Sequence, residues 1–192
     1  MRNSKVFSLT LVAIFAALTA IGAFIKIPLP IVPFTMQIVI VFLAGSILGS
    51  KRGLQSQLVY IFVGLAGLPV FTQGGGLTYV LQPTFGYLVG FAVGAFIIGY
   101  IIERGGEEPS RIRFVVANLV GTFVIYAIGA PYVYFALNFL LDMPTSASTV
   151  FMTAFLSTVG VDIVLAIVTG LFARRIYFIL NKKMFNVLEV PK

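Results

Sequence analysis

The fold that we expect is decided by residues 7–33, which read FSLTLVAIFAALTAIGAFI-KIPLPIVP. A further apolar run follows them. The first nineteen of residues 7–33 carry no charge. That is close to the length that an α-helix needs to cross about 30 Å of hydrocarbon. The next eight residues contain Pro28, Pro30 and Pro33, which cannot continue a helix because proline lacks a backbone N–H. The stretch therefore predicts a membrane-spanning helix that ends in a stiff loop.

The composition of the whole chain agrees with that prediction. Of its 192 residues, 59% are hydrophobic and 10% are charged, and the mean hydropathy is +1.07. Such a balance lies outside the range of soluble globular proteins. We therefore expect an all-α, multi-pass membrane protein with a single transmembrane domain, residues 1–192.

The basic residues predict how the chain is threaded. Twelve of the thirteen Lys and Arg residues lie in five short clusters between apolar runs, and only Lys26 stands apart. Alternate loops can then place every cluster on one side, which the positive-inside rule assigns to the cytoplasm together with both termini. The net charge of +7 is thus explained by topology and anionic lipid, and we expect no nucleic-acid partner.

This threading predicts six transmembrane helices, at residues 7–25, 35–49, 54–70, 83–102, 114–131 and 160–180. The stretch 132–159 is mostly apolar, and we expect an outer helical hairpin or cap there. A seventh crossing would place the basic C-terminal segment on the outside and break the charge rule.

Missing residue types limit the chemistry. The chain has no Cys and no His, so it offers no disulfide, thiol nucleophile or imidazole base. It also lacks the Gly-x-x-x-x-Gly-Lys-Ser/Thr phosphate loop, so it cannot bind ATP by that route. We therefore expect a protein that is not an enzyme and that holds no metal or cofactor.

One acidic residue, Asp162, lies within a predicted span. It precedes Arg174 by twelve residues, which places it about 18 Å from that charged boundary. Because a charge at the membrane centre costs roughly 3 kcal/mol even on lenient scales, such a residue normally faces a cavity or a partner. Three interpretations stay open. Asp162 accepts hydrogen bonds from a ligand, it titrates as the proton carrier of a stand-alone proton-coupled transporter or channel, or it caps the start of the sixth span.

Polar and aromatic side chains gather toward the expected outer side, near the proline loop, the glycine-rich stretch 72–76 and spans four and five. Thr78, Tyr79 and Tyr126 belong to this group. Each alone is more often a helix-packing contact, but together with the acidic residue they suggest a pocket. The candidate substrate-binding residues are Phe34, Thr35, Gln37, Gln73, Gln82, Thr84, Phe85, Tyr87, Asn118 and Asp162.

Two rows of small residues predict close approach between helices. The row on the fourth span, which we interpret as internal packing, is Gly86, Gly90 and Gly94. The row on the first span, which fits internal packing or docking of another membrane subunit, is Ala13, Ala16, Ala17 and Ala20.

Three segments together resemble the BioY family, the biotin-specific substrate-binding components of energy-coupling factor transporters. They are PLPIVPFTMQ at 28–37, GLAGLPVF at 64–71 and QPTFGYLVGF at 82–91, with a weaker match at 160–162. The resemblance implies six membrane helices and an outward-facing biotin site in a bacterial cell membrane. It also implies association with a transmembrane coupling protein and two cytoplasmic ABC-type ATPases, and it assigns docking on that coupling protein to the alanine row.

The chain departs from the family pattern in three places. Asp162 follows Gly160 and Val161, where the family often has Pro-Gly. Leu165 stands one turn after Asp162, where a Lys is expected, and Phe85 stands where a glycine is common. The resemblance therefore implies that Asp162 is a site residue without a cationic partner. Since Lys26 is the only basic residue on the outer side, we expect the carboxylate of biotin to stay near water or to bind hydroxyl and backbone N–H groups.

The chemistry of biotin suits these residues. Its ureido ring has two N–H donors and one carbonyl acceptor, and an ionised Asp accepts charge-assisted hydrogen bonds from such donors. The amide side chains that can both donate to the ureido carbonyl and accept from its N–H groups are Gln37, Gln82 and Asn118. The rings that can enclose the bicycle and its alkyl chain are Phe34, Phe85 and Tyr87.

Overall fold

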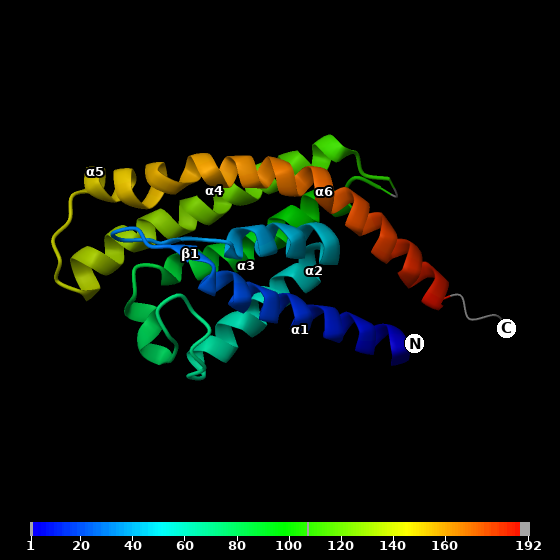
Figure 1. Cartoon of the computed structure of the whole chain (residues 1–192), viewed down its shortest axis with the longest axis horizontal. Helices are drawn as coiled ribbons and strands as arrows, with labels where there is room; N and C mark the ends of the chain where they lie inside the picture. The colour runs from blue at the N-terminus through cyan, green and yellow to red at the C-terminus, as the bar shows by residue number, and fades with distance from the viewer. Residues whose placement is uncertain (1, 107, 189–192) are drawn as a thin grey trace.

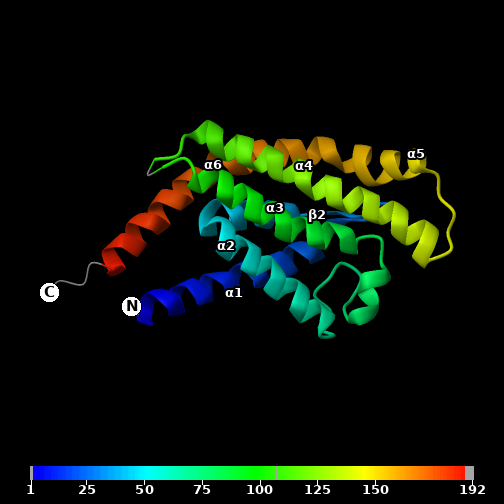
Figure 2. The same cartoon turned by 180° about the vertical axis from the view of Figure 1, so that it is seen from behind.

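The computed structural model describes residues 2–106 and 108–188, which form an elongated bundle of helices. Most helices run along the long axis, and both ends of the described chain lie at the same end of the molecule (Figures 1 and 2). In chain order the elements are α1 (Arg2–Phe24), β1 (Lys26–Ile27), β2 (Phe34–Thr35), α2 (Gln37–Leu65), η1 (Leu77–Leu81), α3 (Phe85–Glu103), α4 (Arg111–Phe135), η2 (Ala136–Leu140), α5 (Ala147–Val150), η3 (Phe151–Leu156) and α6 (Ser157–Leu188).

Five helical stretches are long and apolar enough to cross a membrane, judged by length and composition. They lie in α1, α2, α3, the run from α4 into η2, and the run from α5 to α6. Many of their outward side chains are large and apolar, as lipid-facing positions are, among them Phe62, Phe123 and Phe172. The predicted helical membrane architecture is therefore confirmed, with five continuous candidate helices where six spans were predicted.

The difference in number arises at Gly49, where α2 bends. Gly49 has φ +81° and ψ −178°, which is not helical and which favours glycine. Figure 1 shows the second part of α2 turning back from the first. The carboxylate of Glu103 accepts hydrogen bonds from the backbone N–H (2.8 Å) and the hydroxyl (2.6 Å) of Ser50. These bonds satisfy one of the free donors where the second part begins.

The stretch 132–159, all of which is described, contains no separate long helix. Pro131 lies inside α4, which continues as the π-helical turn η2. After the loop 141–146, α5 and the π-helical η3 lead directly into α6. One arm of the hairpin here is thus the end of α4 with η2, and the other is α5 and η3, which continue as α6. The helices α4 and α6 lie side by side in both views (Figures 1 and 2).

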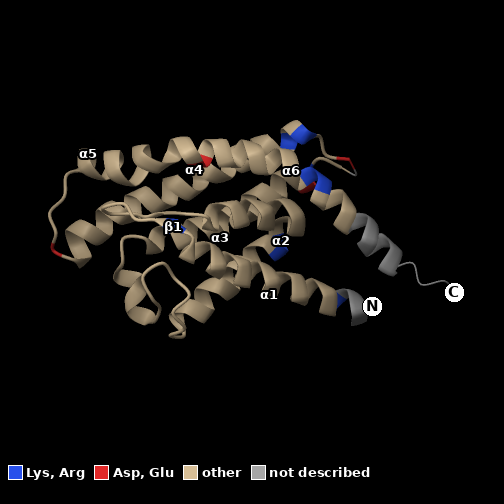
Figure 3. Cartoon of the chain, in the orientation of Figure 1, with Lys and Arg blue, Asp and Glu red and all other residues tan. Residues whose placement is uncertain are grey.

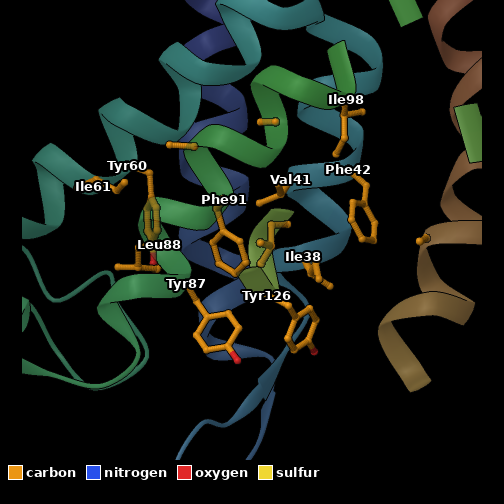
Figure 4. Packing of buried hydrophobic residues seen from close by; sticks show 14 of the residues in the cluster. Ile38, Val41, Phe42, Tyr60, Ile61, Tyr87, Leu88, Phe91, Ile98 and Tyr126 are labelled. Atoms are coloured by element: carbon orange, nitrogen blue, oxygen red, sulfur yellow. The ribbon is translucent and has the colours of Figure 1, made fainter. Parts of the chain in front are cut away.

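The glycine row of α3 packs against α4, as predicted. A Cβ built on Gly90 would lie 2.9 Å from the carbonyl oxygen of Ile125, and one on Gly94 would lie 2.8 Å from the Ile125 side chain. A side chain at either position would force these two helices apart. The core around this contact is closely filled, with Val41, Phe91 and Ile98 grouped between the helices (Figure 4).

The alanine row of α1 is divided between the interior and the surface. Ala16 is 6% exposed and belongs to the core, and Ala20 packs against that core. Ala13 and Ala17 are exposed. Docking of a partner subunit therefore stays a prediction for the two exposed alanines, whereas Ala16 is covered by its own chain.

Candidate functional site

The loop of β1 and β2 and the loop before η1 lie away from the two chain ends (Figure 1), and a pocket lies beside them. It has about 530 Å³ of empty space, a volume that includes part of its opening. Six separate segments contribute to it: the proline loop with β2, α2, the loop 66–76 with η1, α3, α4 and α6. The lining residues are Val32, Pro33, Phe34, Thr35, Gln37, Ile38, Thr72, Tyr79, Thr84, Tyr87, Leu88, Phe91, Ile125, Tyr126, Thr158 and Asp162.

Asp162 supplies the one carboxylate of this lining and is 5% exposed. Its Oδ2 accepts a hydrogen bond of 2.5 Å from the hydroxyl of Tyr126, which also lies 2.6 Å from the Thr158 hydroxyl. Its Oδ1 is buried and has no hydrogen-bond partner among the residues described. A buried carboxylate oxygen that accepts no hydrogen bond is energetically costly. A ligand with N–H groups can donate the missing hydrogen bond.

The position of Asp162 excludes the helix-cap interpretation. Asp162 lies in the second turn of α6, and the chain before it is already helical from Ala147 onward through α5 and η3. An N-cap residue sits outside the helical backbone and accepts from N–H groups that have no intrahelical partner. Asp162 does neither, so that alternative is wrong.

Two tyrosines form an aromatic wall beside the carboxylate. The rings of Tyr87 and Tyr126 meet edge to face, with centroids 5.6 Å apart and an interplanar angle of 88°. Figure 4 shows them side by side below Phe91, with their hydroxyl ends toward the same side. The Tyr87 hydroxyl donates to the backbone carbonyl of Ala154 in η3, so its ring is held in place against the hairpin of α4 and α6.

A second polar network lines the side formed by η1 and α3. The Tyr79 hydroxyl lies 2.8 Å from the Thr72 hydroxyl and 3.0 Å from that of Thr84. This network connects the glycine-rich loop to the start of α3. Thr72, Tyr79 and Thr84 all line the pocket, so the loop and the wall are held together at the site itself.

Gln37 lies at the start of α2, and its side-chain amide forms hydrogen bonds within the protein. Gln37 is 2% exposed, and its Nε2 donates to the Tyr60 hydroxyl at 2.8 Å. Its Oε1 accepts from the Thr35 hydroxyl at 3.3 Å. The Tyr60 hydroxyl in turn donates to the carbonyl of Val70. These contacts fix β2 and the loop 66–76 against α2.

Two loops cover the pocket, and they contact each other. In the first, β1 and β2 pair antiparallel, with Lys26 opposite Thr35 and Ile27 opposite Phe34. In the second, Phe71 and Gly74 form a tight bridge. We call these two segments, residues 26–35 and 66–76, the cover. The ammonium of Lys26 donates to the carbonyl of Thr72 and so joins its two halves.

The structure brings six of the ten predicted binding residues into the lining: Phe34, Thr35, Gln37, Thr84, Tyr87 and Asp162. Four others lie elsewhere. Gln73 is exposed on the glycine-rich loop, and Gln82 is half-buried at the end of η1. Phe85 packs against Tyr132 with ring centroids 6.0 Å apart.

Asn118 is the fourth, and its surroundings explain its position. It is fully buried, accepts from the Ser46 hydroxyl at 3.2 Å and donates to the carbonyl of Ala166 at 3.1 Å. Both contacts bind α4 to its neighbours α2 and α6. The amide is therefore used for helix packing, the ordinary role of a polar residue within a membrane helix bundle.

Two polar lining residues, Thr72 and Thr158, were outside the set expected from the sequence. Thr158 precedes Asp162 by four residues on the same helical run, so helical periodicity places it on the same face, one turn away. That spacing was a usable signal. Tyr79 and Tyr126 belong to the outer polar group that the sequence indicates, but not to the ten candidate binding residues.

Comparison with known proteins gives a consistent result. Residues 1–182 match the sequence model of the BioY family. The chain is 58% identical over 193 aligned positions to a probable biotin transporter BioY of Lysinibacillus sphaericus, covering 100% of this chain and 98% of that protein. It is 38% identical over 164 positions to the biotin transporter BioY of Thermotoga maritima, covering 85% and 91%.

The fold also matches a solved structure. The crystal structure of the S-component for biotin from an ECF-type ABC transporter superposes with a TM-score of 0.79 at 28% identity. The match covers 91% of this chain and 93% of that one. These similarities point to a transporter family rather than to an enzyme.

Proposed function

The chain belongs to the BioY family, and we propose that it is the biotin-binding membrane subunit of an ECF-type vitamin uptake transporter. It captures biotin from the outside and depends on separate coupling and ATPase subunits for transport. The names of its relatives favour this function over a stand-alone proton-coupled transporter or channel.

One observation carries the proposal: the unpaired Oδ1 of Asp162 in a pocket with mostly apolar walls. The ureido ring of biotin is rigid and has an N–H donor on each side of its carbonyl, and a carboxylate is the strongest neutral-pH acceptor that a side chain offers to such a donor. Tyr126 already holds the other oxygen. The carboxylate is thus oriented before the ligand arrives, which reduces the entropic cost of binding.

The rest of the pocket fits the apolar part of biotin. Leu88, Phe91 and Ile125 supply apolar walls beside the rings of Tyr87 and Tyr126. A fused bicycle with an alkyl chain buries its surface against such walls, while the few polar groups fix its orientation.

The distribution of charge supports a six-crossing topology with both termini in the cytoplasm. Figure 3 shows most Lys and Arg positions toward the end of the bundle where both chain ends lie. The bend of α2 at Gly49 adjoins Lys51 and Arg52, so each part of α2 can cross separately with its basic turn on that side. The pocket would then face outward across a bacterial cell membrane.

The division of labour among subunits follows from what the sequence lacks. The chain contains no phosphate loop of the Walker type, so the energy for transport comes from elsewhere. We propose a transmembrane coupling protein and two cytoplasmic ABC-type ATPases as partners. Ala13 and Ala17 are small and exposed on α1, and small residues allow close approach of another membrane helix.

The proposal is tested by equilibrium binding of radiolabelled biotin to the detergent-purified chain alone. The label avoids intrinsic fluorescence, which is a weak reporter in a chain without tryptophan. Saturable binding that unlabelled biotin displaces, and that thiamin and riboflavin do not, supports the proposal. Absence of biotin binding by folded protein, together with pH-dependent flux by the chain alone in liposomes, would instead support the proton-coupled alternative.

A further inference from the structure

The pocket contains a carboxylate but no cationic residue, and this raises the question of where an anionic ligand group is held. None of the lining residues is Lys or Arg. Biotin is itself a carboxylate, and its negative charge is repelled by Asp162. The charged end of the ligand must therefore lie away from Asp162, toward the cover.

Lys26 is the one Lys or Arg of the cover, residues 26–35 and 66–76. Figure 3 shows blue at β1, of which Lys26 is the first residue, whereas the other blue positions lie toward the end that holds both termini. Among the described residues, no Asp or Glu forms an ion pair with Lys26; its ammonium contacts the Thr72 carbonyl. Its positive charge is consequently not neutralised by the protein.

The backbone places Lys26 at the boundary of the pocket. It pairs in the β-ladder with Thr35, which lines the pocket, and the carbonyl that it contacts belongs to Thr72, which lines it from the other half of the cover. The ladder is extended by a 3.0 Å hydrogen bond from the Met36 N–H to the Ile25 carbonyl, so the position of Lys26 is well fixed.

An ammonium has three N–H donors, and the Thr72 carbonyl uses one. We propose that Lys26 binds the carboxylate of biotin where the two halves of the cover meet; this inference rests on the function proposed above. The ligand then spans the pocket, with its ureido ring at Asp162 and its carboxylate at Lys26. Lys26 then supplies a positive charge to the site. The family pattern has a Lys at the position of Leu165, which is far from Lys26 in the sequence.

The test compares biotin with biotin methyl ester, which lacks the negative charge, on the wild type and on Lys26→Gln. In the wild type, the ester should bind about tenfold more weakly than biotin, the size of one charge-assisted hydrogen bond at a partly exposed site. In Lys26→Gln, biotin should lose about the same factor. The affinity for the ester should change less than about twofold. Unchanged ester binding also shows that the variant is folded.

Two further variants make the test specific. Lys26→Arg keeps the charge and should retain most of the affinity for biotin. Lys51→Gln removes a lysine that follows the bend of α2 and does not line the pocket, and it should change neither ligand's affinity. Equal losses for both ligands in Lys26→Gln, or no loss for either, would overturn the proposal, since Lys26 would then only join the loops or do nothing. If the wild type binds neither ligand, the proposed function itself fails.

Discussion

The Tyr126 hydroxyl donates to one oxygen of Asp162, and within the described chain the other oxygen of that carboxylate has no partner. The two residues come from different helices, α4 and α6, and meet at the wall of the pocket. Such a half-satisfied buried carboxylate is unfavourable in the empty protein. It becomes fully satisfied when a ligand supplies N–H donors.

Tyr126→Phe is expected to weaken biotin binding by about 1–2 kcal/mol, a rise in Kd of roughly 5- to 30-fold. The hydroxyl that orients Asp162 is lost, while the ring that packs against Tyr87 is kept. The measurement is a titration with radiolabelled biotin. Tyr134→Phe on the same helix is the matched control, because Tyr134 is 40% exposed and does not line the pocket. Equal affinities for the two variants would remove Tyr126 from the site.

Tyr79→Phe is expected to release biotin faster, with a smaller effect on association. The substitution removes the hydroxyl that connects Thr72 on the cover to Thr84 at the start of α3. A less firmly held loop opens more often, and changes of this kind act mainly on the dissociation rate. The check is a chase of bound labelled biotin with unlabelled biotin. Thr78→Val, at an exposed neighbouring position, should leave the rate unchanged; a rate unaffected in Tyr79→Phe would contradict this account of the cover.

Gly49→Ala is expected to lower the thermal stability of the chain in detergent. The positive φ at this bend costs a residue with a Cβ about 1 kcal/mol or more. The new methyl group would also meet the Glu103 carboxylate that binds Ser50.

Gly160→Ala provides the matched control for that experiment. Gly160 is exposed on α6, and a Cβ built there meets nothing within 4 Å. In a helix interior, alanine should stabilise by about 0.5–1 kcal/mol relative to glycine. A Gly49→Ala protein that melts at the wild-type temperature would show that the bend is not held in the conformation described.

The sequence predicted the helical class well because hydropathy and charge report how deep each segment lies. They do not report which way a helix face points. Asn118 and Tyr126 are both polar residues of α4, but Asn118 binds neighbouring helices and Tyr126 lines the pocket. Only the packing of α4 against α2 and α6 separates these roles, and that packing is set by contacts between distant segments.

The helix boundaries show a second limit of sequence reasoning. Pro131 predicted the end of a span, but the structure accommodates it within α4 and continues through η2. A π-helical turn and neighbouring helices can satisfy the backbone groups that a proline frees. The local effect of proline therefore predicts the loop after α1, where three prolines act together. It does not predict the continuous helix at Pro131, where a single proline is supported by tertiary packing.

The most direct test of the account is the affinity of Asp162→Asn for biotin, measured beside the wild type with the same purified preparations. The substitution keeps the shape of the side chain and removes the negative charge that accepts the ureido N–H groups. We predict a loss of about 1–3 kcal/mol, or roughly 5- to 150-fold in Kd, in a variant that remains folded. Wild-type affinity in Asp162→Asn would contradict the central claim, because the unpaired carboxylate could then have no part in holding the ligand.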